Sequence, residues 1–155
     1  GNLELAEKFG APLIINSKYR DGTLRKEAAK KNKPILVYEG GESMRFDYLA
    51  INEGYNGCLR LMNAYQMIDA EVPDMPAVKI VKDTWIRANS SGLFHMNKSN
   101  GSHVLKGDLL GVVCNPFGNL EDKIYAPEAG YLVGINNQPV VNQGDALIHL
   151  GFTEE

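Results

Sequence analysis

The stretch VLKGDLL at residues 104–110 decides the fold of the second half of the chain, because it returns as VNQGDAL at residues 141–147. Both copies follow the pattern VxxGDxL, which places Gly107 and Gly144 where a tight turn is expected. A segment with a single apolar face cannot bury that face alone, so a repeated segment predicts two halves that pack on one another. We therefore expect a small closed sandwich of two interlocked halves.

The sequence around the two copies is typical of an all-β domain. From Thr84 onward, short apolar runs alternate with clusters of turn-forming residues, which read NSSG, SNGS, KGD, NPFGN, PEAG and NQGD. Glycine, asparagine, aspartate and proline at this close spacing end each strand after a few residues. The pattern predicts a β domain over residues 84–152.

The first half of the chain has a different pattern of apolar residues. Helical spacing of apolar residues predicts a helix over residues 2–9, with Gly10 as its stop. The apolar run APLIIN at residues 11–16 then predicts a short buried strand, and residues 21–32 predict a turn followed by a basic helix. Helices alternate here with short apolar strands, as they do in an α/β fold.

The α/β pattern continues to about residue 72. KPILVYE, which ends at Glu39, predicts a second strand, and residues 46–68 predict a helix that is broken near Gly54 and Gly57. Residues 1–72 are thus expected to form an α/β layer with a parallel sheet. The proline-containing segment 73–83 is expected to connect this layer with the β domain.

Composition and charge exclude several classes of partner. The formal net charge of −3 is spread along 155 residues, so we expect no binding to nucleic acid or to an acidic membrane surface. No stretch approaches the roughly 20 apolar residues that a membrane span requires. The two cysteines, Cys58 and Cys114, form no CxxC pair, which indicates reduced thiols in a cytoplasmic protein.

The stretch ILVYEGGE at residues 35–42 ends an apolar run in Glu39 and two glycines. Open α/β sheets bind their ligands at the carboxyl ends of strands, and glycines let a substrate approach the backbone closely. Glu39 is therefore a candidate catalytic residue. It is equally well explained as a turn carboxylate that caps the next helix, and the strand pattern leaves both interpretations open.

Five segments, residues 21–57, 85–94, 104–118, 124–134 and 139–151, together carry a likeness to a known family. In this order they resemble the succinylglutamate desuccinylase and aspartoacylase family of zinc-dependent deacylases. The resemblance implies the C-terminal portion of a zinc-carboxypeptidase-like α/β domain, followed by a small β domain. The β domain in turn resembles the barrel-sandwich hybrid of lipoyl and biotinyl domains.

The family's zinc ligands, a His and a Glu of an HxxE motif and a later His, lie upstream of the position that matches YEGGE. This sequence contains no HxxE, and its histidines, His95, His103 and His149, all lie in the β half. The resemblance therefore implies the C-terminal part of an enzyme that uses zinc in its full-length form. We expect this chain to hold no metal of its own and to be inactive alone.

The resemblance also implies a reaction. The full-length protein would hydrolyse the amide bond of N-acyl amino acids or similar small amides, with Glu39 as general base and acid. Arg45, and less directly Arg25 on the basic helix, are candidates for binding an anionic substrate. A homo-oligomer is possible for such an enzyme.

The alternative is a non-catalytic module, in which the sandwich is a carrier or an interaction domain. A lipoyl or biotinyl carrier needs a modified lysine at the tip of a hairpin, and Lys123 is the candidate here. NPFGNL at residues 115–120 is the better candidate for the hairpin tip, so we interpret Lys123 as a solvated strand lysine.

Overall fold

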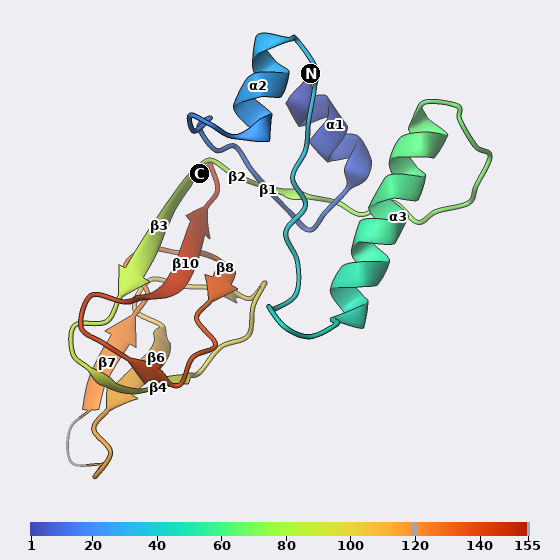
Figure 1. Ribbon diagram of the computed structural model, residues 1–155. Coiled ribbons are helices and arrows are strands. Elements are labelled where there is room, and N and C mark those ends of the chain that lie inside the picture. The colour runs from blue at the N-terminus through green and yellow to red at the C-terminus, as the bar shows by residue number, and fades with distance from the viewer. Residues whose placement is uncertain (119–120, 155) are drawn as a thin grey trace. The chain divides into compact units, whose positions relative to one another are not determined.

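The computed structural model describes residues 1–118 and 121–154, and the chain divides into two compact units, Gly1–Lys79 and Ile80–Glu155 (Figure 1). The boundary falls inside the segment 73–83 that the sequence predicts as a connection. This segment also contains β2 (Val78–Ile80) and the start of β3 (Lys82–Arg87). No helix in the described part of the chain is both long enough and apolar enough to cross a membrane.

The first unit is mainly helical. Its elements are α1 (Asn2–Phe9), β1 (Leu13–Ile15), α2 (Leu24–Lys30) and α3 (Tyr48–Ala64), and β1 pairs with β2 in a two-stranded sheet. The predicted end of the first helix is confirmed, because Gly10 adopts the left-handed conformation with φ +71° and its N–H donates to the Ala6 carbonyl. The predicted strand at residues 11–16 and the predicted basic helix are also confirmed.

The predicted break in the third helix is wrong, because α3 runs through both glycines without interruption. A Cβ at Gly57 would lie 2.5 Å from Cε1 of the Phe9 ring, and one at Gly54 would lie 2.9 Å from Cε1 of Tyr38. The two glycines therefore let aromatic rings pack directly on the helix backbone. Their low helix propensity, about 1 kcal/mol each relative to alanine, is offset by this packing.

Replacing Gly57 with alanine is expected to destabilise the protein although it raises helix propensity. The new methyl group would overlap the buried Phe9 ring, and overpacking of this kind costs about 1–3 kcal/mol. Urea denaturation followed by helical circular dichroism measures the effect. Asn52→Ala, at an exposed position of the same helix, is the control and should leave stability unchanged or raised; equal effects of the two variants would contradict the packing argument.

The strand predicted at residues 33–39 is not formed in this structure, where the segment carries no strand assignment. A strand needs a neighbour to pair with, and the two-stranded sheet of this unit contains only β1 and β2. The segment is held by side chains instead. Asn2 Oδ1 accepts from the Ile35 N–H at 3.1 Å, and the Tyr38 hydroxyl donates to the Ala50 carbonyl at 2.8 Å.

The second unit is all β, as the sequence predicts. Besides β3 it contains β4 (Gly92–Met96), β5 (His103–Val104), β6 (Leu109–Cys114), β7 (Glu121–Tyr125), β8 (Gly130–Ile135), β9 (Val140–Val141) and β10 (Ala146–Phe152). These strands form two four-stranded sheets with the orders β3-β10-β8-β5 and β7-β6-β4-β9, in which neighbours are antiparallel.

The two sequence copies exchange strands, which confirms the expected interlocking. β5 of the first copy pairs with β8 of the second, and β9 of the second copy pairs with β4 of the first. The sheets share one core, whose fully buried members include Val104, Leu110, Leu132, Val141, Leu147 and Leu150. Each half thus buries its apolar face against the other.

The VxxGD pattern forms the same turn in both copies. Gly107 and Gly144 have φ values of +86° and +90°, which glycine adopts without strain. After each glycine an aspartate Oδ2 accepts from a backbone N–H three residues earlier: Asp108 accepts from Leu105 at 3.3 Å, and Asp145 accepts from Asn142 at 2.7 Å. The aspartate therefore closes the turn that the glycine permits.

The turn at Asp108 is expected to weaken in acid. Its hydrogen bond from Leu105, with a further contribution from Lys98 at 3.2 Å, holds the pKa of Asp108 below its usual 3.8. A lowered folded-state pKa contributes stability above the unfolded-state value, and this contribution is lost as pH falls through the lowered pKa. Asp108→Asn should therefore flatten the acid limb of the stability curve, measured by Trp85 fluorescence in denaturant. The control Glu154→Gln should leave the curve unchanged.

Candidate functional site around Glu39

The loop that follows Glu39 turns back sharply on the start of α3. Gly41 and Met44 adopt positive φ values of +78° and +66°. A Cβ at Gly40 would lie 2.8 Å from the Tyr38 hydroxyl oxygen, and one at Gly41 would lie 2.9 Å from Cβ of Asp47. A larger residue at either glycine would clash with Tyr38 or Asp47, so both glycines are required. Their close packing confines the loop to this path.

Asp47 is the residue that caps the following helix. Its Oδ1 accepts from the N–H groups of Leu49 and Ala50 at 3.0 and 3.2 Å. A helix has one N-cap residue, and here that position is filled by a good capping side chain. The interpretation of Glu39 as the helix cap is therefore wrong.

Glu39 itself is exposed, and its carboxylate makes no hydrogen bond or ion pair with any residue that the structure describes. The residue before it is fixed. Tyr38 donates to the Ala50 carbonyl, and its ring packs on Gly54, so that burial, and to a lesser degree Glu53 and Asp47, raises the pKa of its hydroxyl. The Glu39 carboxylate is thus free of contacts with the described residues, while the backbone directly before it is held on α3 by Tyr38.

A shallow hollow of about 200 Å³ lies next to this loop. It is lined by Tyr38, Gly40, Gly41, Glu42, Arg45, Phe46, Asp47, Ala50 and Ile51. Arg45 is 73% exposed, and its Nε lies 2.9 Å from Glu42 Oε1. The structure therefore brings Arg45 into the wall of a hollow whose other wall directly follows Glu39.

Arg25 has a different set of partners. Its Nη1 and Nη2 donate to the Ser17 hydroxyl at 2.7 Å and to the Ser17 carbonyl at 2.9 Å, and its guanidinium lies 5.4 Å from the centre of the Tyr19 ring. These bonds tie α2 to the loop after β1. The side chain is therefore engaged in local structure.

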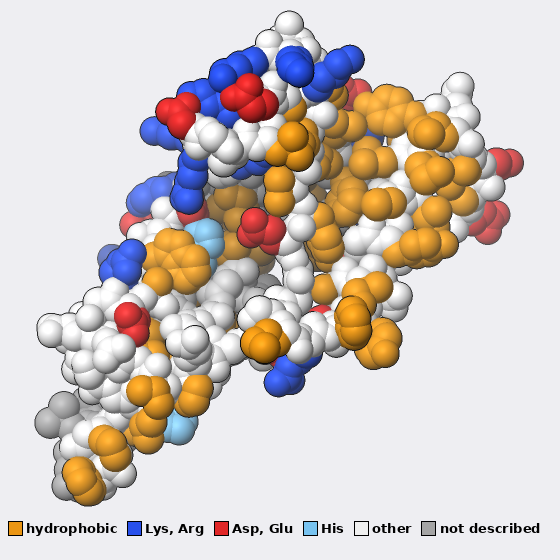
Figure 2. Space-filling view, viewed as in Figure 1, with side chains coloured by type: hydrophobic (Ala, Val, Ile, Leu, Met, Phe, Trp, Pro, Cys, Tyr) orange, Lys and Arg blue, Asp and Glu red, His pale blue; other side chains and the backbone are white. Residues whose placement is uncertain are grey.

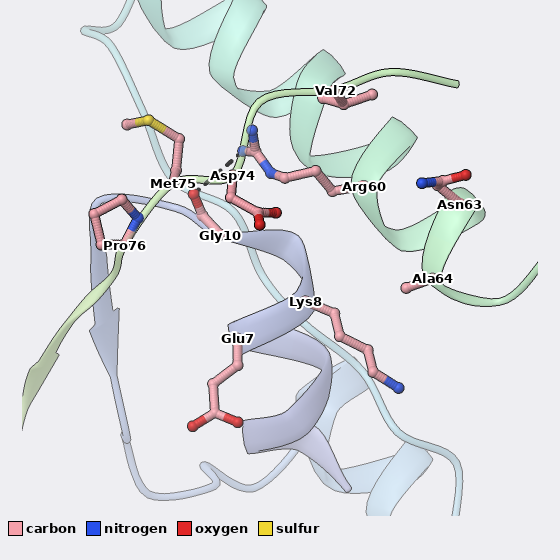
Figure 3. Close-up of a pocket in the computed structure, with 10 residues that line it drawn as sticks. All are labelled: Glu7, Lys8, Gly10, Arg60, Asn63, Ala64, Val72, Asp74, Met75 and Pro76. Carbon is pink, nitrogen blue, oxygen red and sulfur yellow. Dashed lines mark hydrogen bonds between the residues drawn. The ribbon is translucent and has the colours of Figure 1, made fainter. Parts of the chain in front are cut away.

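A larger hollow of about 520 Å³ lies between α1, α3 and the segment before β2 (Figure 3). In Figure 3 the Arg60 side chain extends from α3 towards the Gly10 carbonyl. Arg60 is only 7% exposed and donates to three backbone carbonyls, those of Phe9 at 2.7 Å, Pro73 at 3.0 Å and Gly10 at 3.2 Å. The guanidinium N–H groups of Arg60 therefore hold the wall of the hollow together, and their role is structural.

The described residues contain no group of three or more His, Cys, Asp or Glu side chains that could hold a metal ion. His149 lies 2.5 Å from Asp83 Oδ2 and stacks on Trp85 at 4.6 Å, and His103 contacts Tyr131 edge-on at 4.9 Å. Two of the three histidines are thus committed to pairs on the β unit. The described side chains do not fit a zinc ion.

Comparison with known proteins finds solved structures with a similar fold. No family model and no curated protein matches the chain. Solved structures do match. The product-bound ectoine utilization protein EutE (DoeB) from Ruegeria pomeroyi is 19% identical with a TM-score of 0.82, over 98% of this chain and 49% of that one.

Family proteins with the same fold come from other bacteria. A succinylglutamate desuccinylase/aspartoacylase from Rhodobacter sphaeroides is 18% identical with a TM-score of 0.83, over 99% of this chain and 49% of that one. An aspartoacylase family protein from Mesorhizobium loti is 17% identical with a TM-score of 0.76, over 99% and 48%. The chain spans about half the length of the proteins it matches. It therefore has the fold of the C-terminal part of the succinylglutamate desuccinylase/aspartoacylase proteins.

Proposed function

We propose that this chain supplies the acid and base of a zinc-dependent hydrolase that cleaves the amide bond of N-acyl amino acids or similar small amides. The observation that carries the proposal is the state of Glu39. Its carboxylate is exposed and uncommitted among the described residues, and it follows a residue that is anchored to α3. The helix cap, which would otherwise explain a carboxylate here, is Asp47.

Glu39 suits proton transfer in amide hydrolysis. A carboxylate within about 3 Å of the attacking water accepts its proton, and the resulting acid then protonates the leaving amine. The close packing of Gly40 on Tyr38 and of Gly41 on Asp47 fixes the path of the backbone directly after Glu39. The same group therefore serves both steps, first as base and then as acid.

Arg45 is the better candidate of the two for binding a substrate carboxylate. It lines the hollow beside the loop, and its guanidinium can pair with a carboxylate through two parallel hydrogen bonds once it releases Glu42. Arg25 would first have to release Ser17. We keep Arg25 as the second candidate.

Zinc would activate the water and polarise the carbonyl of the substrate. Because the described residues of this chain do not fit a zinc ion, its ligands would come from protein that this chain does not contain. We therefore expect this chain to be inactive on its own. The β unit would narrow the entrance to the site or hold subunits together in a homo-oligomer, and the free thiols of Cys58 and Cys114 support a cytoplasmic enzyme.

The strand exchange between the halves of the second unit supports a barrel-sandwich hybrid like that of lipoyl and biotinyl domains. A carrier role has less support, because Lys123 lies inside β7, opposite Val112 of β6, and not at a hairpin tip. The tip predicted at residues 115–120 lies partly outside the described residues. We therefore retain the carrier or interaction module only as the alternative.

The proposal is tested by comparing this 155-residue chain with the full-length protein on a panel of N-acyl amino acids in the presence of zinc. The full-length protein should release free amino acid and retain zinc after dialysis. This chain alone should do neither, because the side chains that the structure describes offer no zinc ligand set. Hydrolysis and stoichiometric zinc in this chain alone, or no hydrolysis by the full-length protein on any substrate, would refute the proposal.

A further inference from the structure

The Tyr38 side chain supports the backbone on both sides of Glu39. A Cβ on Gly40 would lie 2.8 Å from the Tyr38 hydroxyl oxygen, so this side chain reaches from the residue before Glu39 to the residue after it. The same hydroxyl donates to the Ala50 carbonyl at 2.8 Å, and Ala50 lies in the first turn of α3. A Cβ on Gly40 would also lie 3.1 Å from Cβ of Ala50. The two neighbours of Glu39 are thus held at one place on the helix.

The ring of Tyr38 is fixed as well as its hydroxyl. A Cβ on Gly54 would lie 2.9 Å from its Cε1, and its centroid lies 5.4 Å from that of the buried Phe9 ring. Phe9 in turn packs on Gly57. Hydrophobic side chains gather over α3 in Figure 2, so the rings pack on an apolar part of the molecule. Tyr38 is therefore anchored at two separate points of α3, by its ring and by its hydroxyl.

Glu39 differs from both of its neighbours. Tyr38 and Gly40 contact α3, whereas Glu39 between them is exposed and its carboxylate is free of contacts with the described residues. This alternation is typical of a chain whose successive side chains point to opposite sides. Since no described side chain holds the carboxylate, the backbone is the part of Glu39 that this chain fixes.

The Tyr38 hydroxyl is a hydrogen-bond donor and not a second acid or base. Burial, and to a lesser degree the charges of Glu53 and Asp47, raises its pKa above the usual 10.0. It therefore stays protonated near neutral pH, and its proton is donated to the Ala50 carbonyl. An effect of Tyr38 on the reaction must then act through the position of Glu39.

We propose that Tyr38 is a positioning residue, which sets where the Glu39 carboxylate lies relative to the attacking water by fixing the backbone before and after it. The inference rests on the proposed function, because it acts through Glu39 as acid and base. A general base must lie within hydrogen-bond reach of the proton that it accepts. A displacement of about 1 Å in such a group can cost about 10²-fold in rate.

Tyr38→Phe in the full-length protein tests the inference. Phenylalanine keeps the ring on Gly54 and Phe9 and removes only the hydroxyl. The Ala50 carbonyl lies inside α3, where a carbonyl also accepts from the N–H four residues later, so the substitution should leave the fold intact. We expect kcat for N-acyl amino acids to fall about 10-fold, with unchanged KM, zinc content and thermal stability.

Tyr65→Phe is the matched control. Tyr65 follows the last residue of α3 and is 52% exposed, so the substitution removes a tyrosine hydroxyl from the same helix at a distance from the loop. This variant should keep the full rate. An equal loss of kcat in Tyr65→Phe and Tyr38→Phe would overturn the assignment to Tyr38.

A double-mutant cycle with Glu39→Gln separates positioning from a general effect on the site. If Tyr38 acts through Glu39, Tyr38→Phe lowers kcat about 10-fold in the parent protein and leaves the residual rate of Glu39→Gln unchanged. A residue that only supports the fold would lower both rates by the same factor. Equal factors in the two backgrounds, or a loss confined to KM, would overturn the inference.

The outcomes distinguish this inference from the proposed function. A full rate in Tyr38→Phe, beside a loss of about 10²-fold or more in Glu39→Gln, overturns the positioning role and leaves the assignment of Glu39 as acid and base intact. A full rate in Glu39→Gln refutes the proposed function, and the inference falls with it because Tyr38 then has no catalytic carboxylate to position. A loss in Tyr38→Phe that disappears in the Glu39→Gln background supports both.

Discussion

Replacing Glu39 with glutamine should lower turnover of N-acyl amino acids by the full-length protein by about 10²-fold or more. Glutamine keeps the size of the side chain and part of its hydrogen-bonding ability, but it cannot accept the proton of the attacking water. Because Glu39 makes no hydrogen bond or ion pair among the described residues, the substitution removes no structural contact from this chain. The loss should therefore appear in kcat, with unchanged zinc content and unchanged thermal stability.

Glu42 provides the matched comparison, since it is the neighbouring carboxylate on the same loop. Its Oε1 pairs with Arg45 Nε at 2.9 Å, so Glu42→Gln releases the guanidinium beside the hollow. We expect a change in KM for anionic substrates with little change in kcat, because a change in ground-state binding leaves the chemical step intact. A full rate in Glu39→Gln, or an equal loss of kcat in both variants, would refute the assignment of Glu39 as acid and base.

The parts of the fold that the sequence predicts correctly depend on local chemistry. The VxxGD turns are predictable because a glycine with positive φ and an aspartate that closes the turn lie next to each other in the sequence. The end of α1 at Gly10 is predictable for the same reason. The repeat then implies the interlocked sandwich, because neither half can bury its apolar face alone.

The errors arise where distant residues decide the outcome. Gly54 and Gly57 resemble helix breakers, but they are packing sites for Tyr38 and Phe9, which no local pattern indicates. Residues 33–39 have strand propensity, and propensity without a pairing partner produces no strand. In the site, Asp47 was the available signal against Glu39 as helix cap, since an aspartate directly before a helical pattern is a good N-cap.

Of the substitutions described for the first unit, Arg60→Met should be the most destabilising. It should lower the free energy of unfolding by about 3–5 kcal/mol. The sequence offered one signal for it, a single charged residue in the otherwise uncharged stretch GCLRLMNA. Arg60 donates to the carbonyls of Phe9, Gly10 and Pro73, and its Nη2 lies 3.7 Å from Glu53 Oε2. Methionine fills a similar volume but leaves these carbonyls without their donor and Glu53 without its counter-charge.

The two units allow the effect to be located. All three helices of the described chain lie in the first unit, so helical circular dichroism reports its unfolding, while fluorescence of the single tryptophan, Trp85, reports on the second. Arg45→Met is the control, because Arg45 is 73% exposed and a surface substitution of this kind changes stability by about 0.5 kcal/mol or less. Adding Glu53→Gln to Arg60→Met should recover part of the loss, since it removes the carboxylate charge that the first substitution leaves unpaired. If Arg60→Met lost no more stability than the control, the three hydrogen bonds would not hold the start of the unit to α3, and the wall beneath the larger hollow would need another explanation.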